Sequence, residues 1–132
     1  MDHTASHEIE WAPGLADHVH GKVVFGPMLL AETPEALTVI GVTFGAGAYL
    51  DWHRHPAGQL LYVVDGTAVV QTEDGEAVLA GAGDVVFAPA GEVHWHGATG
   101  NAAMTHLSMT DGGPTEWVGR TVTEEEYHSA LP

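Results

Sequence analysis

Residues 47–66 read GAYLDWHRHPAGQLLYVVDG, residues 83–94 read GDVVFAPAGEVH, and these two stretches decide the fold of the chain. Their apolar runs are short and are interrupted by Asp65-Gly66 and by Pro89-Ala90-Gly91. Glycine and proline at such intervals mark turns between strands. The pattern therefore predicts an all-β protein, either a sandwich or a barrel.

The same pattern extends outward from these two stretches. Residues 37–44 are rich in β-branched and aromatic side chains, which favour strands. Further runs of this type predict strands over residues 59–64, 67–71, 78–80, 84–88 and 103–109. Asp65-Gly66 predicts a hairpin with a type I′ turn, because both residues tolerate positive φ angles. Glu73-Asp74-Gly75 predicts the next turn.

Helix and irregular structure are expected only near the ends of the chain. Thr123 and Glu126 have the spacing of a capping box, which predicts a short C-terminal helix. Residues 1–20 are polar and irregular, so we expect an N-terminal arm that is partly disordered. With 132 residues and no internal repeat, the chain is expected to form one domain over residues 1–132.

Composition narrows the expected partners and location. The chain has 18 acidic residues against only Lys22, Arg54 and Arg120, and its net charge is −15. Such a surface repels phosphate backbones and anionic lipids, so neither nucleic acid nor membrane is expected as a partner. The absence of cysteine excludes disulfides and thiolate chemistry. We see no signal-peptide pattern and no long apolar run, so the expected location is cytoplasmic.

Histidines form the most informative cluster in the sequence. Five of the ten histidines fall in three places, namely His53 with His55, His94 with His96, and His106. Residues i and i+2 of a strand point to the same face, so each pair presents two imidazoles side by side. Neutral imidazoles that converge in this way are common ligands of first-row metals. The sequence therefore predicts a metal site built on two strands.

The spacing around these pairs resembles a known family. Gly47-x5-His53-x-His55-x3-Gln59-x6-Gly66 is similar to the first motif of the cupins, and Gly83-x5-Pro89-x-Gly91-x2-His94 to the second. The resemblance covers about residues 22–110 and implies a double-stranded β-helix, the cupin jelly-roll barrel, with a divalent metal ion in its mouth. The ligands that it implies are His53, His55, Gln59 and His94.

Two positions depart from the pattern of the family. Gln59 stands where a glutamate is usual, and Ala98 stands where an asparagine is usual. Three imidazoles and an amide are all neutral, so they leave the charge of a dication uncompensated. A substrate oxygen bound there should lose its proton more easily than it would beside a carboxylate ligand.

A narrower resemblance suggests a reaction. The residues around Gln59, those around His94 and the segment Ala103-Met104-Thr105-His106-Leu107 look like the small bacterial manganese cupins that act as hydroxynitrile lyases. By that resemblance the metal is Mn(II), whereas the ligand types also admit Fe(II), Zn(II) or Ni(II). It implies that His96 and His106 act as acid/base groups in cleaving a cyanohydrin to a carbonyl compound and cyanide. Strand alternation puts His106 on one face with Met104 and Ser108.

Other functions fit the same residues. Many cupins with open metal positions bind O2, so a metal-dependent dioxygenase is the second hypothesis. A non-enzymatic cupin that binds a small molecule or a metal is the third. In each case we expect a small-molecule partner. We also expect a homodimer or homotetramer, because bare strand edges and sheet faces favour association.

Overall fold

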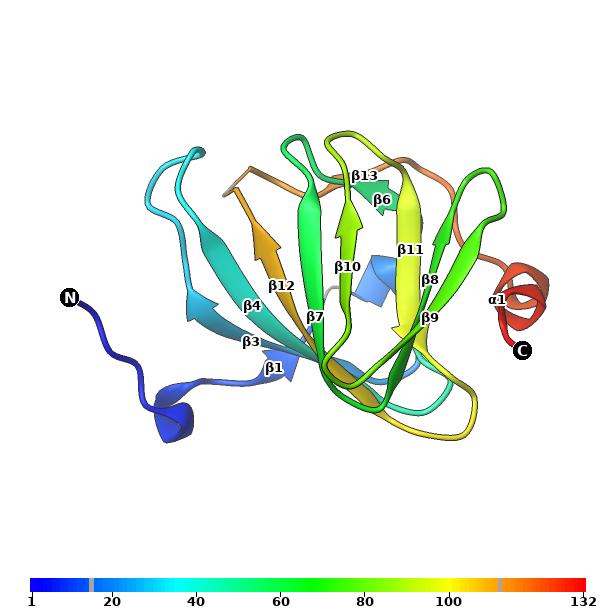
Figure 1. The fold of residues 1–132 in the computed structure, drawn as a ribbon, viewed down its shortest axis with the longest axis horizontal. Helices are drawn as coiled ribbons and strands as arrows, with labels where there is room; N and C mark the ends of the chain where they lie inside the picture. The colour runs from blue at the N-terminus through cyan, green and yellow to red at the C-terminus, as the bar shows by residue number, and fades with distance from the viewer. Residues whose placement is uncertain (15, 112) are drawn as a thin grey trace.

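The strands form two antiparallel sheets (Figure 1). This computed structural model describes residues 1–14, 16–111 and 113–132. In chain order the elements are η1 (Ser6–Glu8), β1 (Ala12–Pro13), η2 (Ala16–His18), β2 (Val19–His20), β3 (Val23–Leu29), β4 (Thr38–Phe44), β5 (Tyr49–Leu50), β6 (His53–Arg54), β7 (Gln59–Asp65), β8 (Thr67–Thr72), β9 (Ala77–Gly81), β10 (Val85–Ala88), β11 (His94–Ala98), β12 (Met104–Thr110), β13 (Glu116–Trp117) and α1 (Glu124–Ala130).

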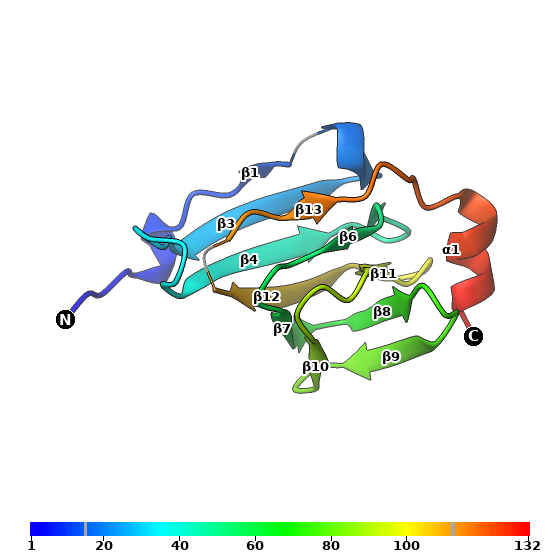
Figure 2. The ribbon, with the colours of Figure 1, turned by 90° about the horizontal axis from the view of Figure 1, so that it is seen from above.

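The order of the strands is that of a jelly roll. Among the described residues, one sheet has six strands in the order β1-β3-β4-β12-β7-β10. The other has seven, with β13-β6-β11-β5-β2 in line and β8 joining β11 to β9. The view from above shows the two layers enclosing a common interior (Figure 2). The predicted all-β double-stranded β-helix with one short C-terminal helix is confirmed.

The hairpin predicted at Asp65-Gly66 is wrong. Strand β7 pairs with β10 and β12, whereas β8 pairs with β9 and β11, so the chain changes sheets at this point. In the described part of the chain, positive φ angles occur only at glycines, so Asp65 lacks the conformation of a type I′ turn. Gly66 has φ +77, and a Cβ there would lie 2.2 Å from the carbonyl oxygen of Ala103. The turn at Gly75 does join the paired strands β8 and β9, as predicted.

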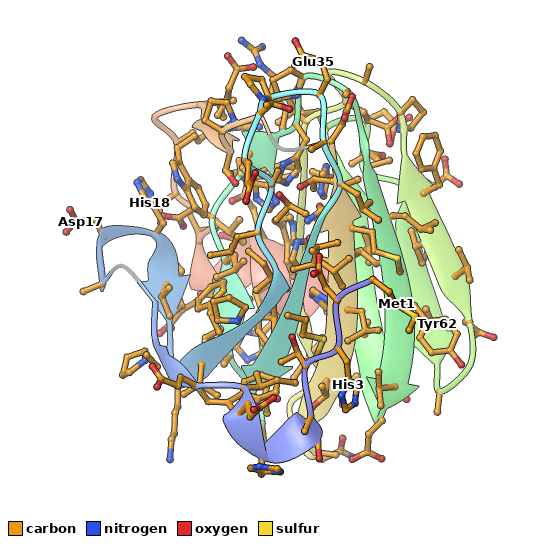
Figure 3. All side chains as sticks on the ribbon, turned by 90° about the vertical axis from the view of Figure 1, so that its left-hand side faces the viewer. Met1, His3, Asp17, His18, Glu35 and Tyr62 are labelled. Carbon is orange, nitrogen blue, oxygen red and sulfur yellow. The ribbon has the colours of Figure 1, made fainter. Side chains whose placement is uncertain are left out.

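Alternation along the strands separates an interior face from an outer one. On β7 the side chains of Leu61 and Val63 are buried, whereas those of Tyr62 and Val64 are exposed. Tyr62 points away from the barrel in the side view (Figure 3). The interior is filled by a cluster of apolar side chains: Val23, Val42, Phe44, Ala48, Leu50, Val63, Ala68, Ala80, Ala98 and Met104.

A second core lies on the outer face of the seven-stranded sheet. Trp52 and Trp95, next to histidines in sequence, point to this face and are buried rather than exposed. Helix α1 covers them, with Tyr127 buried in the same cluster. Its predicted capping box is confirmed, because Thr123 Oγ1 accepts from the Glu126 backbone N–H and the Glu126 carboxylate accepts from the Thr123 N–H.

Parts of the first twenty residues pair with both sheets. Strand β1 lies beside β3, and β2 lies beside β5. The ring of Trp11 lies on the outer face over Gly26 and Gly41, where any Cβ would approach it to less than 3 Å. No helix in the described ranges is long and apolar enough to cross a membrane.

The crossing at Gly66 supplies a test of this topology. We expect Gly66→Ala to lower the free energy of unfolding by about 2–5 kcal/mol, because it adds a backbone clash to an unfavourable positive φ. Gly75→Ala is the matched control, since its φ is +92 and no atom lies within 4 Å of an added Cβ. It should cost only about 1–2 kcal/mol. Urea denaturation measures both losses. If the two variants lose the same free energy of unfolding, the close approach of Gly66 to Ala103 at the change of sheets is contradicted.

Candidate functional site

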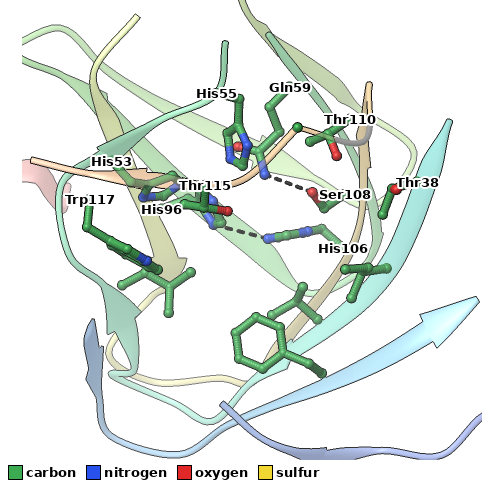
Figure 4. Close-up of a pocket in the computed structure, with 15 residues that line it drawn as sticks. Thr38, His53, His55, Gln59, His96, His106, Ser108, Thr110, Thr115 and Trp117 are labelled. Carbon is green, nitrogen blue, oxygen red and sulfur yellow. Dashed lines mark hydrogen bonds between the residues drawn. The ribbon is translucent and has the colours of Figure 1, made fainter. Parts of the chain in front are cut away.

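One end of the barrel gathers five buried histidines and a buried glutamine. His53, His94, His96 and His106 are at most 1% exposed, Gln59 is 4% exposed and His55 is 7% exposed. They come from four different elements, β6, β7, β11 and β12, and from the loop that follows β6. Figure 4 shows all of them except His94 around one cavity. The alternation that predicted each pair on one face therefore places both pairs in the interior.

His53 and His94 are fixed by register and by their backbone. They are direct partners in the β6–β11 pairing, and their ring centroids are 4.6 Å apart. His53 Nδ1 donates to the carbonyl of Asp51 at 2.8 Å, and His94 Nδ1 donates to the carbonyl of Glu92 at 2.9 Å. A neutral imidazole that donates from Nδ1 carries a lone pair at Nε2. Both histidines therefore present Nε2 as an acceptor to the interior.

Gln59 completes an arrangement of facing acceptors. Its side-chain nitrogen donates to Ser108 Oγ at 2.8 Å, which leaves Oε1 as the atom that faces His94. Gln59 Oε1 lies 2.8 Å from His94 Nε2. Both atoms are acceptors in this arrangement, and acceptors at that distance repel each other unless a positive charge lies between or beside them. The geometry is suited to a bound cation.

Several imidazole nitrogens in the same region are buried with no partner among the described residues. Both nitrogens of His55 and Nε2 of His96 are in this state. A buried polar atom without a partner costs about 1–3 kcal/mol, so such atoms usually have a ligand to bind. The chemistry of these donors fits a first-row metal ion.

His96 and His106 form a hydrogen-bonded pair beside this group. His106 Nε2 lies 3.1 Å from His96 Nδ1, and the link is drawn in Figure 4. Strand β12 brings His106 to the interior with Met104 and Ser108, as alternation predicted. When His96 Nδ1 donates to His106 Nε2, Nε2 of His96 is left as an acceptor that faces the cavity. A proton taken up at His96 can then be shared with His106.

Burial keeps these histidines neutral. It lowers the pKa of His53 to about 3, with a further decrease caused by His94. It lowers the pKa of His55 to about 4 and that of His106 to about 4. The pKa values of His94 and His96 are lowered by burial as well. At neutral pH all five imidazoles are therefore neutral, and each has a lone pair to donate.

Asp51 orients His53 through its backbone carbonyl, and its carboxylate has other partners. Burial alone would raise the pKa of its carboxyl group, but hydrogen bonds from His20, Thr121 and the Val122 backbone lower it. His20 Nε2 lies 2.6 Å from the carboxylate. The carboxylate is thus held outside the histidine cluster, while the carbonyl of the same residue orients His53.

The cavity in front of the histidines is lined partly by apolar side chains and partly by the hydroxyl groups of Thr38, Ser108, Thr110 and Thr115. Its volume is 180 Å³, and Figure 4 shows Trp117 beside His53 at one side. The apolar lining residues are Phe25, Ile40, Val42, Leu50 and Trp117. A small organic molecule with an apolar group therefore fits the cavity, with its polar end at the histidines.

Two overlapping sets of side chains could hold a metal. Ligand atoms of His53, His94 and His96 all lie within 4.8 Å of one another. The sequence predicted His55 and Gln59 together with His53 and His94, and these two residues lie beside the same group. His53 and His94 are common to both sets.

Three contributors were missed in the sequence. Ser108 was recognised only as sharing a face with His106, although that position was the signal that it reaches the interior. Asp51 stands two residues before His53, and this spacing alone could have indicated a second partner for the imidazole. Trp117 carries no local signal, because only the β13–β6 pairing brings it opposite His53.

Comparisons with known proteins agree with this geometry. The family model described as "Cupin domain" matches residues 41–110. The (R)-mandelonitrile lyase of Granulicella tundricola is 41% identical over 117 residues, covering 86% of this chain and 88% of that protein. A gentisate 1,2-dioxygenase from Ralstonia is 32% identical over 65 residues, which is 49% of this chain but 18% of that enzyme. A cupin-like protein from Thermotoga maritima superposes with a TM-score of 0.85 at 36% identity, covering 91% and 92% of the two chains.

The lowered pKa values predict how the metal-free protein responds to acid. The unfolded chain binds protons at histidine below about pH 6.5, whereas His53, His55 and His106 stay neutral in the folded state until about pH 3–4. The contribution of these histidines to the free energy of unfolding is therefore fully present above pH 6.5. It falls as the pH decreases toward 4, by about 1.4 kcal/mol per pH unit for each histidine.

Urea denaturation of chelator-treated protein across this range measures the slope. His106→Gln should make the slope shallower by about 1.4 kcal/mol per pH unit, because it removes one site of proton uptake on unfolding. A free energy of unfolding that stays constant between pH 6.5 and 4.5 would contradict the buried, neutral state of these imidazoles.

Proposed function

Because the chain belongs to the cupin family, we propose that it is a metal-dependent lyase that cleaves or forms cyanohydrins. Its similarity to an (R)-mandelonitrile lyase over most of both chains supports this reaction class. The observation that carries the proposal is the pair of acceptors, His94 Nε2 and Gln59 Oε1, that face each other at 2.8 Å beside unpartnered imidazoles. In this proposal these residues would hold a divalent cation.

The proposed ligands are His53, His55, Gln59 and His94, and the proposed ion is Mn(II). Fe(II), Zn(II) or Ni(II) would also suit three imidazoles and an amide oxygen. All four ligands are neutral, so the ion when bound would supply a strong Lewis acid that lowers the pKa of a cyanohydrin hydroxyl group or polarises a carbonyl. Ser108 orients the amide of Gln59 by accepting from its nitrogen.

His96 and His106 move the proton in the proposed reaction. In the tautomer of His96 that carries its proton on Nδ1 and donates it to His106 Nε2, 3.1 Å away, Nε2 accepts the proton of the substrate hydroxyl. The bond between the carbinol carbon and the nitrile carbon then breaks, and its electron pair leaves with cyanide as the carbonyl forms. His96 returns the proton to cyanide, which releases hydrogen cyanide. In synthesis these steps run in reverse.

The apolar walls bind the remainder of the substrate. Ile40 and Val42 face Leu50 and Trp117 across the cavity lining, and these residues would contact an organic substituent rather than a charged one. Walls of this kind also exclude water, which favours addition of cyanide over hydration of the carbonyl.

A metal-dependent dioxygenase is the second candidate. The local similarity to a gentisate 1,2-dioxygenase favours it. Consumption of O2 by the Fe(II) form with an aromatic substrate, together with no cleavage of any cyanohydrin, would put this function first. Binding of small molecules without turnover in either assay would favour a non-enzymatic role.

Association and location are also proposals. The outer face of β7, β9 and β10 exposes uncharged apolar side chains, although the chain as a whole carries a net charge of −15. The most exposed of them are Val64, Leu79, Val85 and Phe87. A second copy of the chain is the proposed occupant of this face, in a homodimer or homotetramer. A cytoplasmic location stays a prediction, as does the absence of nucleic-acid and membrane partners.

Metal analysis of single variants tests the proposed ligand set. His55→Ala should lower the metal content well below one equivalent per chain, and the double variant His53→Ala/His55→Ala should abolish it, because too few donors remain. His96→Ala should keep its metal. Elemental analysis after dialysis measures each content. Retention by His55→Ala together with loss by His96→Ala would replace His55 with His96 in the ligand set.

His106→Ala separates proton transfer from metal binding. His106 contacts His96 but is not a proposed ligand, so the variant should keep its metal while kcat for cyanohydrin cleavage falls by about 100- to 10,000-fold. Steady-state assays of protein with verified metal content measure this loss. An unchanged kcat would remove His106 from the mechanism. If the Mn(II) form of the wild type cleaves no cyanohydrin, the lyase proposal fails.

A further inference from the structure

A second cavity lies directly behind one wall of the first. Its volume is 370 Å³, against 180 Å³ for the cavity at the histidines. The two cavities share four lining residues, Phe25, Leu50, Thr115 and Trp117. These side chains form the partition between them.

Trp117 is the largest side chain of this partition, and its neighbours hold it in place. Its backbone is the direct partner of His53 in the β13–β6 pairing, and its ring centroid lies 5.1 Å from that of His53. On another side the imidazole of His18 stacks on the indole, with centroids 4.0 Å apart and planes inclined by 6°. His18 lines the second cavity but not the first.

The support behind Trp117 is itself anchored. His18 Nδ1 lies 3.7 Å from the Asp51 carboxylate. His18 ends η2, and Val19 immediately after it pairs with Leu50 between β2 and β5. The segment around residues 16–20 therefore presses against the indole from outside the site. Figure 3 shows His18 on this part of the chain.

Apart from Gly14, His18 and Thr115, the residues that line the second cavity are apolar. Phe25, Leu50 and Trp117 are common to both cavities, and Val19 adds a further apolar side chain to the second. Removal of the indole would therefore join the cavity at the histidines to a larger apolar space.

We propose that Trp117, backed by His18, is the specificity-determining residue that limits the size of the aromatic group on the substrate. With the indole in place, the enzyme prefers aldehydes and cyanohydrins that carry a single ring. Without it, a fused second ring occupies the space beyond the partition. This inference rests on the proposed cyanohydrin lyase function for its substrate class, and on the two cavities for its geometry.

Paired substrates test the size limit. The ratio of kcat/KM for the 2-naphthaldehyde cyanohydrin to that for the benzaldehyde cyanohydrin should rise about tenfold or more in Trp117→Ala, because added pocket volume discriminates by about 10- to 200-fold per small group. His18→Ala should raise the ratio by a smaller factor, since it loosens the wall without removing it. Should the alanine variant fail to fold, Trp117→Leu supplies the same comparison.

Trp11→Ala is the matched control. It removes an indole that lies on the outer face over Gly26 and Gly41 and lines neither cavity, so the ratio should stay at the wild-type value. An equal ratio in the wild type and in Trp117→Ala would overturn the inference. A wild type with equal kcat/KM for the two cyanohydrins would overturn it as well.

Binding without turnover separates this inference from the proposed reaction. Ligand-observed NMR of metal-loaded protein with benzaldehyde and with 2-naphthaldehyde should show the larger aldehyde binding to Trp117→Ala at least about tenfold more tightly than to the wild type. If the wild type cleaves no cyanohydrin but Trp117→Ala binds 2-naphthaldehyde more tightly than the wild type does, the lyase proposal fails. The role of Trp117 as the wall between the two cavities is then still supported. No gain in 2-naphthaldehyde binding by the variant overturns the partition, whatever the activity.

Discussion

His94 Nε2 and Gln59 Oε1 lie 2.8 Å apart in the barrel interior, each with a lone pair directed at the other. The rest of the site depends on the groups that hold these two atoms in place. The carbonyl of Glu92 fixes the tautomer of His94, and Ser108 fixes the orientation of the Gln59 amide. Glu92 lies in the loop before β11 and Ser108 lies in β12, so the geometry exists only when both sheets have assembled. Buried acceptors held this close together favour the binding of a cation.

The same alternation that builds this site also builds the core behind it. In the segment that contains His94 and His96, the intervening Trp95 points to the opposite face and donates to Gln71. Helix α1 covers that face, and Tyr127 donates to the carbonyl of Ala98 at 2.6 Å. Because one strand supplies both layers, the packing under α1 limits how far the imidazoles can move. Rigid support of this kind preserves the distances that metal binding and proton transfer need.

Local periodicity and motif spacing predicted the features that depend on one strand at a time. The pairs His53/His55 and His94/His96, the face that His106 shares with Met104 and Ser108, and the capping box at Thr123 follow from residues two or three apart. The hairpin predicted at Asp65-Gly66 was wrong because turn propensity does not determine which sheet the next strand joins. The contacts of His18 and Trp117 were beyond prediction, since they connect residues almost a hundred positions apart. Long-range register, rather than local pattern, decides them.

Charge is arranged so that the interior stays neutral within a strongly acidic protein. The net charge is −15, yet the carboxylate of Asp51, two residues before His53, is bound by His20, Thr121 and Val122 instead of facing the site. With Gln59 in place of a carboxylate, the proposed ligand set contributes no negative charge. A deprotonated substrate can then supply the negative charge that compensates a bound dication. A reaction that develops negative charge on an oxygen, as loss of a hydroxyl proton does, is stabilised by that imbalance in its transition state more than in its ground state.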